Sequence, residues 1–293
     1  MSAIRLNSIP DLQRKANDVR VDIINMLFPA KSGHTAGPLG MADIFTALYF
    51  HTATHDPAKP KWDGRDRVVL SNGHIAPVLY ATLGEAGYFD KKLFSTLRKF
   101  GSPLQGHPHR GVLAGIETSS GPLGQGLSQA CGMALAAKMD NKKHTVWCLT
   151  SEGEHEEGQT WEAVLLAAKY KLGNLVQIMD RNFIQIDGRT EDIMPLESVS
   201  AKYRAFNWEV VEIDGNDMVE VVEAMDKARA YALNPTSSKP LIIIANTVPG
   251  KGVSFMENKF EWHGKPPNAE EAAKALAELK ESRAKIESAA HSI

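Results

Sequence analysis

A carboxylate and an amide follow two consecutive predicted strands and could bind a metal ion. Glu152 comes just after the apolar run that ends at Thr150, and Asn182 comes thirty residues later, just after the run that ends at Met179. If these runs are neighbouring parallel strands, both side chains reach the same edge of the sheet. With a nearby backbone carbonyl they would supply three of the six oxygen ligands that Mg²⁺ prefers. On spacing alone, ordinary polar loop residues are the more frequent explanation.

Several glycine-containing turns near this edge would suit a phosphate group. Gly153 lets the backbone approach an anion closely, and the helix expected after Gly158 would direct its N-terminus toward it. The turn 121–126 precedes an Ala-rich helix, but a dinucleotide fingerprint would need a glycine where Gln129 stands. A dinucleotide site is therefore disfavoured, while a tight packing turn stays open. Lys251 follows another predicted strand and could bind phosphate, although solvated lysines are common.

Four of the ten histidines lie in loops that contain glycine or proline, and they are His34, His74, His107 and His263. Their spacing is not that of a zinc site. Neutral imidazoles around a phosphate and a sugar would instead donate hydrogen bonds and move protons. A single histidine, by contrast, is more often an ordinary structural residue.

Strands and helices alternate along the middle of the chain. Strands are predicted at 67–70, 144–150, 175–179, 208–214 and 241–247. Helices are predicted at 10–28, 41–50, 75–85, 91–100, 127–139, 159–170, 218–233 and 268–288. Such alternation produces a parallel sheet with right-handed crossovers. The predicted fold class is α/β, with helices on both faces of a parallel sheet and ligands beyond the carboxyl ends of its strands.

The composition is that of an ordinary soluble globular protein. The 293 residues include 33 Lys+Arg and 35 Asp+Glu, a net charge of -2 that would not attract nucleic acid. The longest apolar runs are too short to cross a membrane. Two cysteines without a CxxC spacing indicate buried thiols in a reducing compartment. We expect a cytoplasmic protein with a single domain over 1–293, in which 268–293 form a C-terminal helical appendage capped by Asn268.

Several segments of the chain resemble the transketolase family. The pair Glu152 and Asn182 is similar to the thiamine-diphosphate motif, in which Gly-Asp-Gly is followed about thirty residues later by Asn. The segments 151–163, 170–175, 184–188 and 121–126 resemble transketolases specifically. The resemblance covers about residues 20–264 and corresponds to the first of three transketolase domains. It implies the thiamine-diphosphate-binding fold, thiamine diphosphate as the cofactor, and Mg²⁺, or else Ca²⁺ or Mn²⁺, as the metal.

The resemblance also implies a role for individual residues. The metal ligands would be the side chains of Glu152 and Asn182 and the carbonyl of Ile184. The cofactor would contact His74, Gly121, Leu123, Gly153, Glu154, Asn182, Ile186, Lys251 and His263, with Ile186 packed on the thiazolium ring. The substrate would meet His34 and His107, and His263 would also transfer protons. Glu157 would join a carboxylate network across the subunit interface.

The chain departs from the family pattern at the metal motif and beside the first histidine. Glu152 stands where the family has Asp, Ser151 where it usually has Gly, and Thr35 where Pro tends to follow the histidine. Glutamate keeps the charge but adds one methylene group, which would move the metal or admit a water. The carboxylate is therefore the weakest part of the resemblance.

The resemblance implies a partner as well as a cofactor. The partner would be a C-terminal transketolase subunit with the pyrimidine-binding domain, whose glutamate activates the cofactor, in a two-plus-two heterotetramer. Together they would transfer a two-carbon ketol unit from a ketose to an aldose, with sugar phosphates as substrates. A subunit of another thiamine-diphosphate enzyme with different sugar specificity, or a non-catalytic phosphate-binding relative, stays open. No nucleic-acid or membrane partner is expected.

Overall fold

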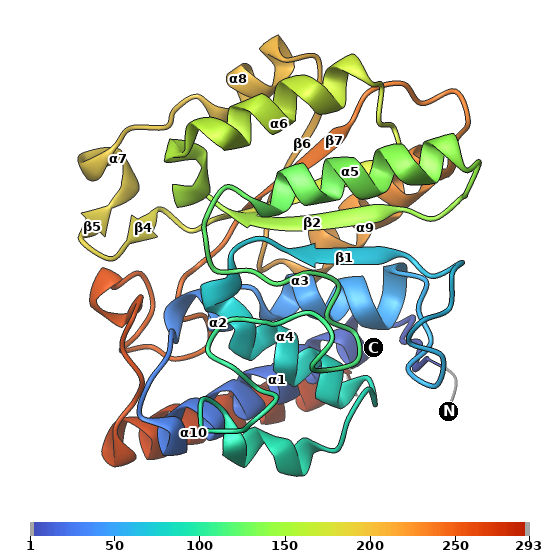
Figure 1. Ribbon diagram of the computed structural model, residues 1–293. Coiled ribbons are helices and arrows are strands. Elements are labelled where there is room, and N and C mark those ends of the chain that lie inside the picture. The colour runs from blue at the N-terminus through green and yellow to red at the C-terminus, as the bar shows by residue number, and fades with distance from the viewer. Residues whose placement is uncertain (1–2, 291–293) are drawn as a thin grey trace.

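A five-stranded parallel sheet forms the centre of the computed structural model, which describes residues 3–290 (Figure 1). The strands are β1 (Arg67–Leu70), β2 (Val146–Ser151), β3 (Leu175–Arg181), β6 (Glu209–Asp214) and β7 (Leu241–Asn246). Their order across the sheet is β1-β2-β3-β7-β6, and every neighbouring pair is parallel. The predicted fold class is confirmed, and each predicted strand is present within two residues of its expected bounds.

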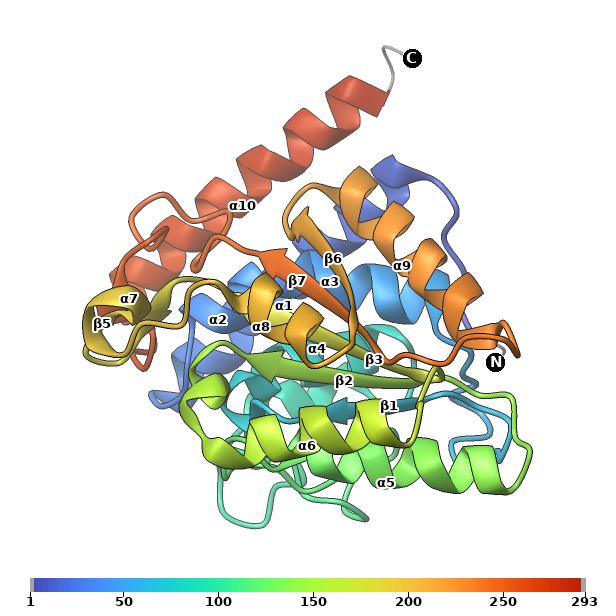
Figure 2. The same cartoon turned by 90° about the horizontal axis from the view of Figure 1, so that it is seen from above.

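Helices cover both faces of this sheet (Figure 2). One face carries α1 (Ile9–Ala30), α3 (Ala42–Ala47), α4 (Ala76–Glu85) and α9 (Met218–Leu233). The other face carries α5 (Gly126–Met139), α6 (Gly158–Lys169) and α8 (Val199–Ala205). Trp147 and Leu149 point into the first core, whereas Val146 and Cys148 point into the second. Successive side chains of a strand alternate between faces, so one apolar strand serves two cores.

Shorter elements surround the edge at which the strands end. They are α2 (Ala36–Gly40), the turn Gly73–Ile75, the turn Gly153–Glu156, the small hairpin of β4 (Ile184–Gln185) and β5 (Gly188–Arg189), α7 (Thr190–Ile193) and the turn Phe260–Trp262. These pieces follow the carboxyl ends of the strands or face them. They are therefore the loops that can form a ligand site.

Two predicted helices are shorter or less regular than expected. The helix expected over 41–50 is α3 followed by a π-helical turn at Leu48–Thr52. The helix expected over 91–100 is only a 3₁₀ turn at Lys91–Thr96. The chain leaves the helical conformation because Arg98 has a positive φ of 61° and its amide donates to the carbonyl of Leu104.

The helix α10 (Ala269–Ala290) packs lengthwise on α1. As predicted, Asn268 caps it: the Glu271 amide donates to Asn268 Oδ1 at 2.9 Å, and the Asn268 amide donates to the Glu271 carboxylate at 2.8 Å. Leu279 is fully buried in the first core together with Ala272 and Ala275. One face of the expected appendage is thus part of the domain core. No helix within residues 3–290 is long and apolar enough to span a membrane.

The buried face of α10 leads to a stability prediction. Leu279→Ala should lower the free energy of unfolding by about 2–4 kcal/mol, because it leaves a cavity between α10 and the core. Glu281→Ala, at an exposed position of the same helix, should change it by less than about 0.5 kcal/mol. Urea unfolding of the two variants measures both values. Equal, small effects would mean that α10 adds nothing to the core.

Candidate functional site

The two predicted metal-site residues lie at one edge of the sheet. Ser151 is the register partner of Asp180, so Glu152 and Asn182 both follow the ends of adjacent strands. The Glu152 amide also donates to the Asp180 carbonyl at 3.1 Å. The prediction that the spacing brings both residues to the same edge is confirmed.

Three histidines from distant parts of the chain meet at this edge. The ring centroids of His34 and His74 lie 5.0 Å apart, those of His34 and His263 5.5 Å, and those of His74 and His263 5.4 Å. His107 is more exposed and lies beside the glycine turn, because a Cβ added to Gly121 would stand 3.7 Å from its ring. The structure therefore brings the four predicted histidines to one place, with His107 at the rim.

Burial keeps these histidines neutral. It lowers the pKa of His34 to about 4 and the pKa of His74 well below its ordinary value, and the neighbouring imidazoles lower both further. Burial lowers the pKa of His263 and of His107 as well. Near neutral pH each ring therefore keeps one N–H donor and one acceptor nitrogen.

Several buried polar atoms around the histidines have no hydrogen-bond partner within residues 3–290. They are Nδ1 of His34, Nδ1 of His263, Oγ of Ser120 and both amide atoms of Asn72. Buried polar groups are nearly always paired in folded proteins. The arrangement therefore fits a polar ligand such as a diphosphate, which would supply the missing partners.

The glycine turn 121–126 packs tightly on the end of β1. A Cβ on Gly126 would stand 2.3 Å from the Ser71 Cβ, so only glycine fits there. Glu154 holds this turn, because its carboxylate accepts from the amides of Gly124 at 2.9 Å and Ser151 at 2.7 Å and from the Ser71 hydroxyl. The Glu154 side chain is fully buried and positions the turn, and the implied contact between Glu154 and the cofactor stays a prediction.

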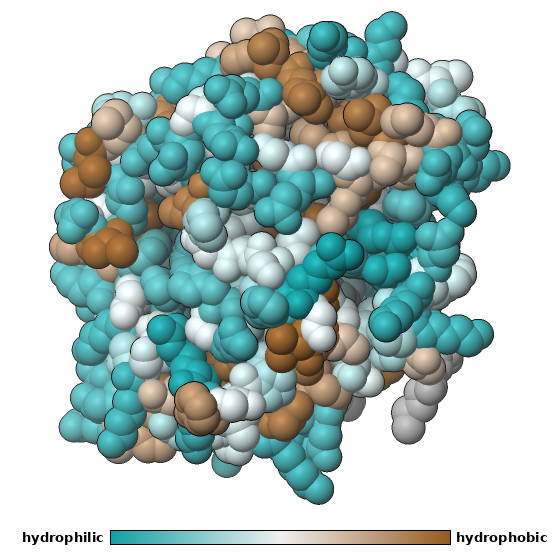
Figure 3. Space-filling model, viewed as in Figure 1, coloured by the Kyte–Doolittle hydropathy of each residue, from teal (hydrophilic) through white to brown (hydrophobic). Residues whose placement is uncertain are grey.

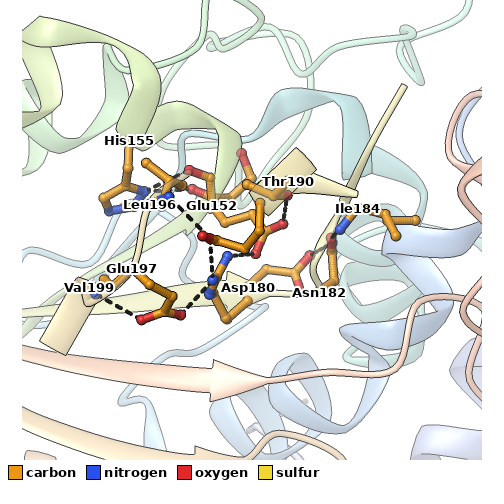
Figure 4. A network of polar contacts seen from close by, with 12 residues as sticks. Glu152, His155, Asp180, Asn182, Ile184, Thr190, Leu196, Glu197 and Val199 are labelled. Atoms are coloured by element: carbon orange, nitrogen blue, oxygen red, sulfur yellow. Dashed lines mark hydrogen bonds and ion pairs between the residues drawn. The ribbon is translucent and has the colours of Figure 1, made fainter. Parts of the chain in front are cut away.

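Glu152 does not present a free carboxylate to a metal ion. Its Oε2 accepts from Arg181 Nη1 at 2.5 Å, and its Oε1 accepts from the Thr190 hydroxyl (Figure 4). Glu152 is 1% exposed, so no solvent competes for these bonds. Each carboxylate oxygen of Glu152 thus already accepts one hydrogen bond, and its role as a metal ligand stays a prediction.

Asn182 and Ile184 lie closer to open space. The Ile184 amide donates to Asn182 Oδ1 at 3.2 Å, and Asn182 Nδ2 donates to the Asp180 carboxylate at 2.9 Å (Figure 4). Burial raises the pKa of Asp180 to about 7. Asn182 and Ile184 line a groove of about 670 Å³, and Phe260 lines it as well. This volume is in the usual range of small-molecule sites.

The groove fits a metal ion only in part. Asn182 Oδ1 and the Ile184 carbonyl are oxygen ligands of the right type. Within residues 3–290, however, no cluster of three histidine, cysteine or acidic side chains is arranged to hold an ion. The carboxylate of the predicted set, Glu152, is paired with Arg181 in this arrangement.

The remaining predicted residues surround the same edge, and their roles stay predictions. Leu123 is 36% exposed and Ile186 is 65% exposed, so both offer apolar surface to a ligand or partner. Gly153 begins the turn after Glu152, and Glu157 is exposed at the start of α6. Lys251 is half-buried in the loop after β7.

Sequence analysis missed the residues that hold these groups in place. Ser71 and Asn72 directly precede His74 and its glycine, so their position next to a site histidine was a usable signal. Arg181 had a weaker signal, namely a charged residue at the end of an apolar strand. Thr190 gave none, because its contact with Glu152 depends on how the β4–β5 hairpin folds back.

Comparisons with known proteins agree with this geometry. The family model for the thiamine diphosphate binding domain of transketolase matches residues 12–284. The crystal structure of transketolase from Campylobacter jejuni superposes with a TM-score of 0.85 at 34% identity, over 95% of this chain and 43% of that one. The chain therefore belongs to the transketolase family.

Within the family, the chain is similar over its length to proteins that are single subunits of two-part enzymes. It is 41% identical to one of the subunits of the apulose-4-phosphate transketolase of Phocaeicola vulgatus, over 94% of this chain and 96% of that one. It is 40% identical to a 6-deoxy-6-sulfo-D-fructose transketolase subunit of a Clostridium species, over 94% and 98%. Human transketolase is 37% identical, but the match spans only 42% of its length. The chain thus corresponds to the thiamine-diphosphate-binding subunit of a split transketolase.

The buried histidines predict how stability depends on pH. The pKa of His34 is about 4 in the folded chain and about 6.5 when unfolded, so the unfolded chain binds more protons between these values. Stability is then complete above about pH 6.5 and falls as the pH drops toward about 4. Each such histidine contributes a slope of at most about 1.4 kcal/mol per pH unit.

Urea unfolding of the full chain between about pH 7.5 and about pH 5 measures this slope. His34→Asn should flatten it, because the variant lacks one of the groups that cannot be protonated when folded. His109→Asn changes an exposed histidine and should leave the slope as it is. An unchanged slope in His34→Asn would show that His34 accepts a proton in the folded chain.

Proposed function

We propose that this chain is the diphosphate- and metal-binding subunit of a two-chain transketolase, which transfers a two-carbon ketol unit from a ketose to an aldose. The observation that carries the proposal is the cluster of His34, His74 and His263. These histidines are neutral and close together, and two of them have unpaired ring nitrogens at the edge of a transketolase-family sheet. The name of the apulose-4-phosphate relative supports a sugar phosphate as the substrate, whereas the name of the 6-deoxy-6-sulfo-D-fructose relative favours a sulfosugar.

The described side chains have chemistry suited to this reaction. Bound thiamine diphosphate supplies the carbanion chemistry that breaks and forms carbon–carbon bonds. His74 and His263 would donate hydrogen bonds to the diphosphate, and Lys251 would add positive charge. Leu123 and Ile186 would exclude water from the thiazolium ring. His34 and His107 would orient the sugar oxygens, with His263 moving a proton at the reacting centre.

The proposed partner is a C-terminal subunit with the pyrimidine-binding domain, in a two-plus-two heterotetramer with Mg²⁺ as the metal. The lengths of the matches support a partner subunit, because the relatives named as subunits match over nearly their whole length and the single-chain enzymes over less than half. Apolar side chains gather over the β4–β5–α7 region (Figure 3), where Ile186, Ile193 and Met194 are exposed. A partner subunit that covers the cofactor would bury this surface.

The first test of the proposal concerns activity. The purified chain should show no ketol transfer with thiamine diphosphate and Mg²⁺, because the group that activates the cofactor belongs to the partner. Adding the C-terminal subunit, co-purified from the native cell, should produce turnover with a sugar phosphate pair. Turnover by the single chain would refute the two-chain assignment. A complex that binds the cofactor but transfers no ketol unit would indicate another thiamine-diphosphate enzyme.

The second test concerns the metal ligand Asn182. Asn182→Ala should weaken metal-dependent binding of thiamine diphosphate by about 1–3 kcal/mol, because a ligand oxygen is lost. Isothermal titration of the assembled complex at several Mg²⁺ concentrations measures this. Asn174→Ala, at the opposite end of β3, is the matched control and should bind as the parent does. If both variants keep the parent's Mg²⁺ dependence, Asn182 is not a ligand.

A further inference from the structure

Arg181 is a buried cation next to the metal-binding edge. Its side chain is 2% exposed, and its guanidinium contacts three carboxylates: Glu152 at 2.5 Å, Glu191 at 2.9 Å and Glu197 at 2.6 Å. The guanidinium also lies 4.5 Å from the centre of the Phe183 ring. The single guanidinium of Arg181 is therefore paired with three carboxylates, and of these three only Glu152 is buried.

The three carboxylates differ in how much they need Arg181. The side chains of Glu191 and Glu197 are 33% and 54% exposed, so water can solvate them. The side chain of Glu152 is 2% exposed and depends on the guanidinium and on Thr190. A buried charge without a partner is strongly unfavourable. A cation that replaced Arg181 at Glu152 would gain the attraction of this buried carboxylate. Arg181 would still be paired with the other two carboxylates, Glu191 and Glu197.

We propose that Arg181 is the resident counter-ion of Glu152 and determines how tightly the site binds its metal. The divalent ion reaches Glu152 only when the guanidinium moves off this carboxylate and stays paired with Glu191 and Glu197. Arg181 is thus a positioning residue for the metal ligand. The inference rests on the proposed function, since it assumes that the edge binds thiamine diphosphate with a metal.

Arg181 also links the metal-binding edge to the β4–β5 hairpin, which contains two predicted site residues. Arg181 joins β3 to Glu191 in α7 and to Glu197, and the intervening β4–β5 hairpin contains Ile184 and Ile186. When Glu152 is released to the metal, the guanidinium bonds that segment alone. The β4–β5 hairpin would then be held by Arg181 through Glu191 in α7, and the Ile184 carbonyl would be able to hold the ion.

The test compares Mn²⁺ binding by the full chain and its variants, with saturating thiamine diphosphate and the partner subunit present. Free Mn²⁺ is measured by electron paramagnetic resonance. Arg181→Met should bind Mn²⁺ at least tenfold more tightly than the parent, because Glu152 loses its competing cation. Glu152→Asp, which shortens the reach to Arg181, should also bind more tightly. Arg204→Met, which removes an exposed charge from α8, should bind as the parent does.

A second measurement covers the case in which Arg181→Met folds poorly. Without metal, Arg181→Met should unfold at a lower temperature than the parent, and Mn²⁺ should raise that temperature by more in the variant. Glu152→Gln combined with Arg181→Met should lose the gain in Mn²⁺ affinity, since the ligand charge is gone. Equal affinity in the parent, Arg181→Met and Glu152→Asp would overturn the inference. No cofactor-dependent Mn²⁺ binding in any of them, parent included, would instead overturn the proposed function.

Discussion

Parallel pairing of β1, β2, β3 and β7 is the constraint from which the site follows. Because these strands run in the same direction, the loops that contain His74, Glu152, Asn182 and Lys251 all leave the sheet at one edge. The strands are buried on both faces, so their register is strongly specified by two separate cores. The sheet thus fixes where these loops lie, and each loop needs only to orient its own side chains.

The site keeps polar groups buried without partners among residues 3–290. Desolvation of His34, His74 and His263 opposes protonation, and atoms of His34, His263, Asn72 and Ser120 that lack a hydrogen bond in this part of the chain cost stability. A tightly folded chain can tolerate such local costs because the rest of the core offsets them. If the proposed diphosphate binds here, these groups would gain the most from it. The buried polar groups that would favour ligand binding at this edge therefore lower the stability of the free chain.

The sequence predicted the features that depend on hydrophobic period and residue spacing. It did not predict side-chain contacts that depend on how far a side chain reaches. Strand alternation gave the sheet, and the thirty-residue interval placed Glu152 and Asn182 on adjacent strands. It could not show that Glu152 reaches Arg181 or that Glu154 turns inward, because both outcomes depend on the folding of distant loops around Thr190 and Gly124. The helix expected over 91–100 is absent because the Arg98 amide donates to the carbonyl of Leu104 in the following loop, which overrides the helical preference of the segment.

The packing of α10 has a consequence for how the chain can be joined to other chains. Glu278 accepts hydrogen bonds from the amide and hydroxyl of Ser254, and Leu279 lies against Gly252, so this helix supports the loop that contains Lys251. The last turns of α10 are more exposed than this contact region. A fusion that keeps α10 whole would leave this contact intact, whereas a truncation that removes Glu278 would remove the two hydrogen bonds that hold Ser254 in the loop containing Lys251.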